Sequence, residues 1–297
     1  MRGRSSGVFR AAGSLAVIAV FAGGVRVVAE EAKEVVVRAI SKWDAGCDGG
    51  QRDSWDNMAR AWYDEITDNW PWPWGHGSAA WAKDGFYHNG NIVDSDFTDA
   101  DKVAWGNDLG NDRADDVDVM MVALHGGNAN DNRWTGRVRV NEAGDGNCDT
   151  YQGSIVLGEA GSDLEFLHLS SCFSMDQEDW WPAWSDTFKG LHQIHGFHGI
   201  MWISSARADD YEDFADDAFD IPLVEAWYDN LYDTGIGDGD WDQCPVARGA
   251  GTSQNNLWSR MDHERYNNVY SDPTNPSWHG VVYIRGCDPK DKPALPN

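Results

Sequence analysis

The sequence has little positive charge: its 297 residues hold 23 Lys and Arg against 49 Asp and Glu, which gives a formal net charge of −26. This balance excludes a protein that binds nucleic acid through a broad basic surface, because phosphate binding needs Lys and Arg in excess. Disorder of the whole chain is also excluded, since 41% of the residues are hydrophobic and 12% are aromatic, enough to build a core. The length suits one large domain or two small ones.

Several short motifs that indicate a particular chemistry are also missing. The sequence contains no Gly-x-Ser-x-Gly elbow, no P-loop and no Gly-x-Gly-x-x-Gly. These absences argue against serine hydrolases built on such an elbow, P-loop NTPases and dinucleotide-binding enzymes. Carboxylates are too plentiful to single out a pair of the kind that glycosidases use.

Long apolar runs are absent after the first thirty residues. Residues 1–12 carry three arginines, residues 13–24 form a short apolar run, and residues 27–29 (Val-Val-Ala) offer small side chains for cleavage. This order is typical of a secretory signal peptide, and the run is too short for a spanning helix; an uncleaved anchor is the alternative. We expect residues 1–29 to be a signal peptide and the product to be secreted or held at the cell surface, outside the membrane.

Cysteine is scarce: the sequence has five cysteines, an odd number, at positions 47, 148, 172, 244 and 287. In an exported protein four of them can pair and one is left over. Cys47, Cys148, Cys244 and Cys287 lie in or beside Gly-, Asp- or Pro-containing segments that we expect to be surface loops, and the sequence leaves their pairing open. Cys172 ends an apolar run instead, so it is the expected free thiol. A buried small hydrophobic residue is the alternative for Cys172.

Strand-like and helix-like segments alternate along the chain. Apolar and β-branched runs predict strands over residues 34–41, 117–124, 164–169, 196–204 and 281–284, and a short one near 137–140. Helical spacing predicts helices over residues 53–69, 176–189, 211–219 and 223–232, and a short one near 98–105. Such alternation predicts an α/β fold, a three-layer sandwich with a mostly parallel central sheet.

Two of the predicted strands end in reactive residues. The run VDVMMVAL leads into His125 and Gly126, and the run LEFLHL leads into two serines and Cys172. Functional groups of an open parallel sheet lie beyond the carboxyl ends of its strands, and 47 residues between His125 and Cys172 leave room for the crossover that makes the strands neighbours. An imidazole can activate a thiol, and the N–H groups of Gly126 and Cys172 would form an oxyanion hole.

An apolar block that ends in His-Gly, followed by an apolar block that ends in Cys, resembles the pattern of the caspase-haemoglobinase fold, the group of caspases, legumain, gingipain, clostripain and separase. The segment GLHQIHGFHGIMW resembles the helix-to-strand step after the Cys in exported bacterial and archaeal members. The resemblance covers roughly residues 34–235. It implies a single caspase-like α/β domain over residues 30–287, with long Asp- and Trp-rich loops, followed by a C-terminal tail over residues 288–297.

The resemblance implies a cysteine hydrolase, most simply an endopeptidase that acts on a peptide or protein. Carried over to this sequence, it makes His125 the general base, Cys172 the nucleophile and Gly126 an oxyanion donor. The sequence departs from the peptidase pattern after both residues, with Gly-Gly-Asn after His125 and Phe-Ser-Met after Cys172. Two alternatives remain: a non-catalytic binding or surface module of the same fold, and a calcium-dependent carbohydrate-binding protein.

Charge and aromatic content suggest where a substrate would lie. The acidic composition favours a substrate with Arg or Lys before the scissile bond, and Asp209, Asp210 and Asp213 follow a predicted strand as candidate pocket acids. Trp180 and Trp181 would line a groove through stacking or cation–π contact. Core packing is the alternative for these tryptophans.

The implied reaction requires no cofactor, but a structural calcium ion fits the acidic loops. Asp238, Asp240 and Asp242 form an oxygen-rich segment of the kind that holds calcium. The segment is not a strict EF-hand, because Gln243 and Gly249 occupy the places of its Gly and Glu.

Three histidines are spaced three residues apart, at His192, His195 and His198. Three imidazoles can bind zinc. A predicted boundary between helix and strand runs between them, so we do not expect them to share one metal ion.

Overall fold

The central sheet has eight strands, of which seven are hydrogen-bonded in the order β2-β1-β3-β7-β8-β10-β11, while β9 pairs with β10 outside this path. Its strands are β1 (Glu34–Ala39), β2 (Ala82–His88), β3 (Val119–Ala123), β7 (Phe166–Ser170), β8 (Gln193–His198), β9 (Asp233–Ile236), β10 (Trp241–Gly251) and β11 (Trp278–Tyr283). The structure is a computed structural model that describes residues 33–43, 47, 50–71, 75–110, 113–129, 133–138, 148–159, 162–180, 183–237 and 239–297. The chain from Lys33 onward forms one unit, and the account below concerns this unit.

Five adjacent strands, β2, β1, β3, β7 and β8, run parallel to their neighbours, whereas β10 is antiparallel to both β8 and β11. All residues of β3 and β7 are buried. Burial on both faces explains why these segments are mostly apolar along their length instead of alternating. The predicted α/β class with a mostly parallel sheet is confirmed.

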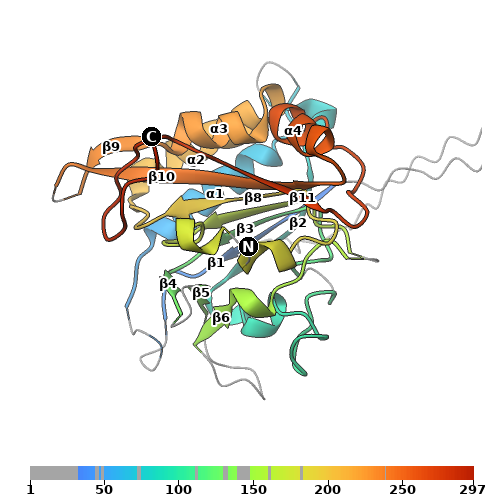
Figure 1. The fold of residues 1–297 in the computed structure, drawn as a ribbon, viewed down its shortest axis with the longest axis horizontal. Coiled ribbons are helices and arrows are strands. Elements are labelled where there is room, and N and C mark those ends of the chain that lie inside the picture. Colours follow the sequence, from blue (N-terminus) through green and yellow to red (C-terminus); the bar gives the residue numbers. More distant parts are fainter. Residues whose placement is uncertain are drawn as a thin grey trace, which may run out of the picture. The chain divides into compact units, whose positions relative to one another are not determined.

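Four α-helices lie on one face of the central sheet, as Figure 1 shows: α1 (Ser54–Ile66), α2 (Ala208–Asp220), α3 (Leu223–Leu231) and α4 (Gln254–His263). A small antiparallel sheet lies on the other side and consists of β4 (Gly126–Asn128), β5 (Trp134–Arg137) and β6 (Asp149–Tyr151). The short 3-10 helices are η1 (Gly77–Ala79), η2 (Asn89–Asn91), η3 (Asp94–Asp96), η4 (Gln152–Ser154), η5 (Gln177–Asp179), η6 (Ala183–Asp186) and η7 (Ser205–Arg207). Within the described residues, loops, 3-10 turns and the small sheet thus stand where a three-layer sandwich has its second layer of α-helices.

Helix α1 shows how side-chain spacing builds the core. Its buried residues Trp55, Met58, Ala59, Trp62 and Ile66 follow the helical repeat. This face packs on β1 and β3, and the helix also packs along α2. The prediction of a helix over residues 53–69 is confirmed.

Two predicted helices are wrong. Residues 176–189 form only η5 and η6 in the described part, and residues 98–105 form turns. Pro182 stands in the middle of the first segment, where it cannot donate a helical hydrogen bond. The indoles of Trp180 and Trp184 donate to backbone carbonyls five and ten residues upstream, so these side chains stabilise a folded loop rather than a helix.

Several strands also differ from the prediction. Strand β8 starts three residues earlier than expected and ends at His198. Strands β2 and β10 and helix α4 were not predicted, because their sequences interrupt the apolar pattern. In β10, for instance, Pro245, Arg248 and Gly249 break the run, although all three are buried.

Two disulfides, Cys47–Cys148 and Cys244–Cys287, leave Cys172 as the free cysteine. The prediction that Cys172 is the unpaired thiol is confirmed, whereas the surface-loop position expected for Cys244 is wrong, because this residue lies buried in β10. Disulfides are typical of extracytoplasmic proteins. The predicted signal peptide lies outside the described residues, and in the part that is described no helix is long and apolar enough to span a bilayer.

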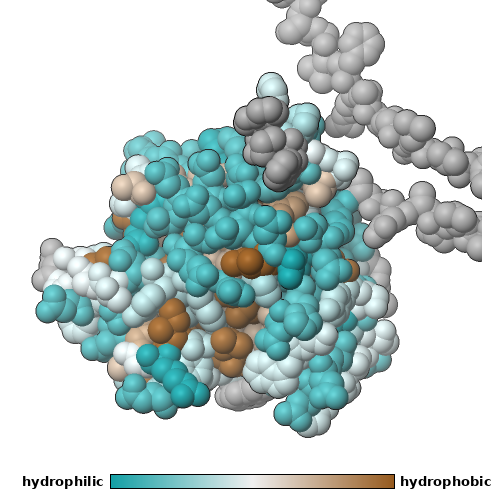
Figure 2. Space-filling model, turned by 90° about the horizontal axis from the view of Figure 1, so that it is seen from above, coloured by the Kyte–Doolittle hydropathy of each residue, from teal (hydrophilic) through white to brown (hydrophobic). Residues whose placement is uncertain are grey.

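The surface over the helices is largely hydrophilic. Figure 2, which views the molecule from this side, shows a mostly hydrophilic face with a few separate hydrophobic patches. Helix α2 contributes strongly, since it exposes Asp209, Glu212, Asp213, Asp216 and Asp220.

The last ten residues pack back onto the domain. Leu295 is buried, and its N–H donates to the carbonyl of Cys287 at 2.8 Å. The N–H of Gly286 donates in turn to the carbonyl of Leu295 at 3.1 Å. The segment expected as a tail over residues 288–297 is therefore an integral part of the fold.

Candidate functional site

Strands β3 and β7 are parallel neighbours, and their carboxyl ends are in register. Ala123 is opposite Ser170, and the N–H of Leu124 donates to the carbonyl of Ser170 at 3.2 Å. His125 lies two residues after Ala123, and Cys172 lies two residues after Ser170. The crossover predicted from their spacing is confirmed, and both residues lie at the edge where parallel sheets carry their functional groups.

The segments after the two strands touch through their backbones. A Cβ atom added to Gly126 would lie 2.0 Å from the carbonyl oxygen of Cys172 and 2.3 Å from Oγ of Ser171. No side chain fits in that space, so position 126 requires glycine for close approach. Trp134 stabilises the same contact between the two segments, because its indole N–H donates to Oγ of Ser171 at 3.1 Å.

The His125 imidazole is held by two tryptophans. Its ring centroid lies 4.5 Å from that of Trp43 and 4.6 Å from that of Trp55. Trp55 also donates its indole N–H to the carbonyl of Ser170 at 3.0 Å. One side chain of α1 thus positions both the imidazole and the end of the strand that leads to Cys172.

The Cys172 thiol is partly buried, with Sγ 3.5 Å from the carbonyl oxygen of Met201. Burial raises the pKa of this thiol, while backbone hydrogen bonds at Met201 and Cys172 and the charge of Arg52 lower it, and the net shift is upward. The resting thiol is therefore protonated at neutral pH. A base has to remove its proton before it can act as a nucleophile.

The backbone turns sharply directly after Cys172. Phe173 has a φ of 58°, in the left-handed region that non-glycine residues seldom adopt. Its N–H donates to the carbonyl of Gly199 at 2.7 Å, and the N–H of Met175 donates to the carbonyl of Phe197 at 2.9 Å. Neighbouring β8 thus stabilises a conformation that costs of order 1–3 kcal/mol and that occurs preferentially at functional sites.

Asp176 connects this turn to three other parts of the fold. Its carboxylate lies 2.8 Å from Nδ2 of Asn128, 3.2 Å from Nδ1 of His198 and 2.6 Å from Nζ of Lys292. Burial alone would raise the pKa of Asp176, but these hydrogen bonds and one from the N–H of Gly199 lower it below its usual value. A buried carboxylate therefore fixes the loop behind Cys172.

A cavity of about 250 Å³ lies beside His125 and is lined by Arg52, His125, Gly126, Gly127, Thr135, Arg137 and Asp149. The guanidinium of Arg137 pairs with Asp149 at 2.8 Å. Two guanidinium groups and one carboxylate line this cavity, so its lining is more basic than the chain as a whole.

Residues 54–286 match a family described as a domain of unknown function, DUF6345. The chain belongs to the DUF6345 family. The match runs from the start of α1 to beyond β11 and includes His125, Cys172 and the Asp176 loop. A search of curated proteins found no match.

The acids predicted to bind a basic substrate lie on the first half of α2 of this DUF6345 domain. Asp209 is exposed, and Asp210 pairs with Arg207 at 3.1 Å. Asp213 is exposed and lines a second cavity, which also contains His76. The structure thus does not bring the three acids together in the cavity beside His125.

Of the two tryptophans predicted to line a groove, Trp180 belongs to the described residues and Trp181 lies outside them. Trp180 is 8% exposed, and its ring packs against Tyr283. Its indole N–H donates to the carbonyl of Met175 at 3.1 Å, and its own carbonyl accepts from Arg248. These contacts match core packing, the alternative for this tryptophan.

The expected calcium loop is only partly described, because Asp238 lies outside the described residues. Asp240 is exposed in a turn, and Asp242 belongs to β10. The carboxylate of Asp242 accepts from the N–H of Asp288 at 3.0 Å.

The three spaced histidines have separate partners. His192 precedes β8 and lies 2.9 Å from Glu264, whereas His198 contacts Asp176. His195 is fully buried near Trp227, and burial lowers its pKa to about 3. The predicted helix-strand boundary between them is wrong, because His195 and His198 both belong to β8.

Several residues of the site were not anticipated from sequence. Trp43, Trp55, Arg52 and Asp176 come from segments with no motif. The one usable signal is Phe173-Ser174, the departure from the peptidase pattern after Cys172, which coincides with the left-handed turn.

Proposed function

We propose that this protein is an exported cysteine hydrolase of the caspase-haemoglobinase type, most simply an endopeptidase. The observation that carries the proposal is the contact between the two strand ends: the backbone at Gly126, next to His125, lies against Cys172, which bears the free thiol. The left-handed turn at Phe173 and the cavity beside His125 support it further.

In the proposed reaction, Sγ of Cys172 adds to the carbonyl carbon of the scissile peptide bond while His125 takes the thiol proton. The N–H groups of Gly126 and Cys172 stabilise the oxyanion that forms. The C–N bond then breaks, and His125 returns the proton to the leaving amine. Water attacks the thioester, releases the carboxylic acid and restores the thiol. No step requires a metal or an organic cofactor.

The raised pKa of Cys172 fits a general-base mechanism better than a preformed ion pair. A thiol that stays protonated at rest needs His125 to remove its proton as the carbonyl approaches. Trp43 and Trp55 support this role, since they restrict the ring to one region beside the strand end.

The cavity beside His125 favours a substrate with an anionic or polar group. Arg52 and Arg137 line it, together with Asp149, which pairs with Arg137. This preference differs from the basic residue that the overall acidity suggests. A panel of fluorogenic peptides with acidic, neutral and basic residues before the scissile bond distinguishes the two.

The decisive experiment compares purified wild type with Cys172→Ala and His125→Gln on that panel. We expect hydrolysis by the wild type and a loss on the order of 10³-fold or more for either variant, as is usual for a nucleophile and its base. Asp242→Asn serves as a control that leaves both residues intact. Equal rates for the wild type and Cys172→Ala would rule out the proposed nucleophile.

A non-catalytic binding module of the same fold is the second candidate. It is favoured by the contact of the Cys172 sulfur with the Met201 carbonyl and by the upward pKa shift of the thiol, both of which suit a structural cysteine. No hydrolysis of any panel peptide, together with a loss of stability in Cys172→Ser, would favour this role.

A further inference from the structure

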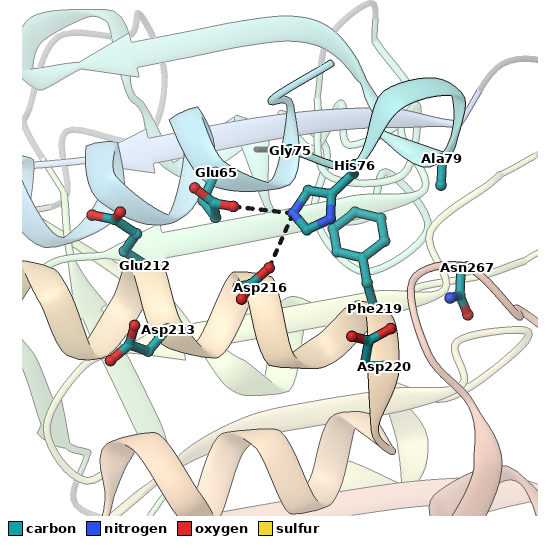
Figure 3. Close-up of a pocket in the computed structure, with 10 residues that line it drawn as sticks. All are labelled: Glu65, Gly75, His76, Ala79, Glu212, Asp213, Asp216, Phe219, Asp220 and Asn267. Atoms are coloured by element: carbon teal, nitrogen blue, oxygen red, sulfur yellow. Dashed lines mark hydrogen bonds and ion pairs between the residues drawn. The ribbon is translucent and has the colours of Figure 1, made fainter. Parts of the chain in front are cut away.

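A second cavity, of about 450 Å³, lies between α1, α2 and the loop that precedes η1. Figure 3 shows three side chains that converge in it from these three segments: Glu65, His76 and Asp216. Nε2 of His76 lies 3.1 Å from Glu65 and 3.8 Å from Asp216. The three ligand-type atoms all lie within 4.8 Å of one another, close enough for one ion to contact all of them.

Contacts with other parts of the protein hold the His76 ring in place. It stacks on Phe219, with ring centroids 3.7 Å apart and an interplanar angle of 16°. Its backbone N–H donates to the carbonyl of Asp68 at 3.0 Å, and its side chain is only 9% exposed. Such a preorganised nitrogen is the feature that separates this cavity from an ordinary acidic patch.

The charge in the cavity is strongly unbalanced. Its lining includes the five carboxylates Glu65, Glu212, Asp213, Asp216 and Asp220, and neither Lys nor Arg lines it. Carboxylates that lie this close together repel one another. A bound cation would relieve this repulsion.

We propose that Glu65, His76 and Asp216 form a binding site for a divalent transition-metal ion such as zinc. One imidazole nitrogen and two carboxylates suit zinc or manganese, whereas calcium and magnesium prefer oxygen ligands alone. One other group of metal-ligand residues occurs in the described part, Asp242 with Cys244 and Cys287. Its two sulfurs are joined in a disulfide and so are not available as thiolates.

The site links two helices that support the region around Cys172. Glu65 belongs to α1, which carries Trp55 against His125. Asp216 belongs to α2, which carries Tyr211, and the Tyr211 hydroxyl lies 2.8 Å from Oγ of Ser170. A metal ion at Glu65, His76 and Asp216 would tie α1 to α2 at the end remote from these contacts. The role proposed for the ion is therefore structural, and it does not depend on whether Cys172 is catalytic.

Titration calorimetry tests the proposal on the full folded protein after removal of metals with EDTA and buffer exchange. We expect saturable binding of one zinc ion, accompanied by a rise in melting temperature, and markedly weaker binding of calcium. His76→Asn and Asp216→Asn are each expected to weaken zinc binding at least about tenfold. Loss of a residue that only supports a metal ligand already has an effect of this size, and loss of a ligand itself should have at least the same effect.

Asp220→Asn is the matched control, because it removes one charge from the same cavity without touching the three ligands. It should weaken binding by no more than about threefold, the effect of charge alone. Glu65→Gln provides a second variant of nearly unchanged shape, should His76→Asn fail to fold. Absence of saturable zinc binding overturns the proposal, as does equal weakening by Asp220→Asn and the ligand variants, or calcium binding as tight as that of zinc.

Discussion

The backbone of Gly126 lies against the carbonyl oxygen of Cys172, so that a Cβ atom at position 126 would come within 2.0 Å of that oxygen. Atoms cannot approach so closely, and the neighbour is backbone that cannot rotate away. The contact therefore fixes the separation of the two segments that carry His125 and Cys172.

The first prediction follows from this contact. Gly126→Ala should force the two segments apart and reduce the free energy of unfolding by about 1–3 kcal/mol, as overpacking does. Gly127→Ala is a matched control, because its Cβ would meet Oγ1 of Thr135 at an ordinary 3.6 Å. Urea unfolding of both variants checks this, and equal stabilities would contradict the assigned contact.

The reactivity of Cys172 provides the second prediction. Because burial raises the pKa of its thiol, the rate of alkylation by iodoacetamide at pH 7 to 8 should be lower in the native protein than in the urea-unfolded protein. Native alkylation should rise steeply with pH. Mass spectrometry of the unreduced protein should find the label on Cys172, with the four disulfide-bonded cysteines unlabelled. A fast, pH-independent reaction near neutrality would instead indicate a stable thiolate.

Glu165 provides the third prediction. Burial, together with the charges of Asp118 and Asp272, raises its pKa from 4.5 to about 10. Because the folded-state pKa is above the unfolded one, Glu165 contributes stability below about pH 4.5 and loses that contribution as the pH rises toward 10. Glu165→Gln should therefore stabilise the protein at pH 8, by about 1–2 kcal/mol. Exposed Glu225→Gln is the control, and denaturant unfolding at pH 5 and pH 8 measures the difference.

The fourth prediction separates the two effects of Glu65. Its pKa, raised by burial to about 7, means that the metal-free protein loses stability as the pH rises from about 4.5 through 7. Glu65→Gln should therefore be more stable than the wild type at pH 8 without metal, yet fail to respond to zinc. A zinc-induced rise in melting temperature equal to that of the wild type would show that Glu65 is not a ligand.

Lys292 provides the fifth prediction, since it pairs with buried Asp176 at 2.6 Å. Lys292→Met should leave a buried carboxylate with one partner fewer and destabilise the protein by about 2–4 kcal/mol. Lys290→Met, two residues earlier, is the control, because Nζ of Lys290 lies over the ring of Trp202, 5.5 Å from its centroid. Thermal unfolding at pH 7 measures both.

The central strands could be predicted from the sequence because their pattern is uniform. β1, β3 and β7 are almost entirely buried, so β3 appears as an unbroken apolar run and the other two as largely apolar runs, interrupted by Arg38 in β1 and His168 in β7. β10 is just as buried, but Arg248 and Gly249 are accommodated there by tertiary contacts: Arg248 bonds to Ser185, and Gly249 leaves room for Met261. Local pattern carries no information about such distant partners.

The same limit applies to the candidate site. His125, Gly126 and Cys172 could be identified because they follow predicted strands, whereas Trp43 and Asp176 act through contacts with residues distant in sequence. His76 could not be identified from the sequence, because it follows a Trp- and Pro-rich segment and its partners Glu65 and Asp216 come from two different helices. Side chains that meet only in the folded chain leave no spacing to detect.

The Cys47–Cys148 disulfide makes the wall of the His125 cavity dependent on redox conditions. It closes a sequence separation of 101 residues, and loops of this length gain roughly 4–5 kcal/mol from such a bond. Nη1 of Arg137 donates to the carbonyl of Cys47 at 3.0 Å, and the N–H of Val138 donates to that of Cys148. The disulfide thus holds the strand that carries Arg137 and Thr135 in place. Reduction with dithiothreitol should loosen this strand, and faster hydrogen exchange over residues 133–138 would report the change. The wall of this cavity would therefore be complete only in an oxidising compartment.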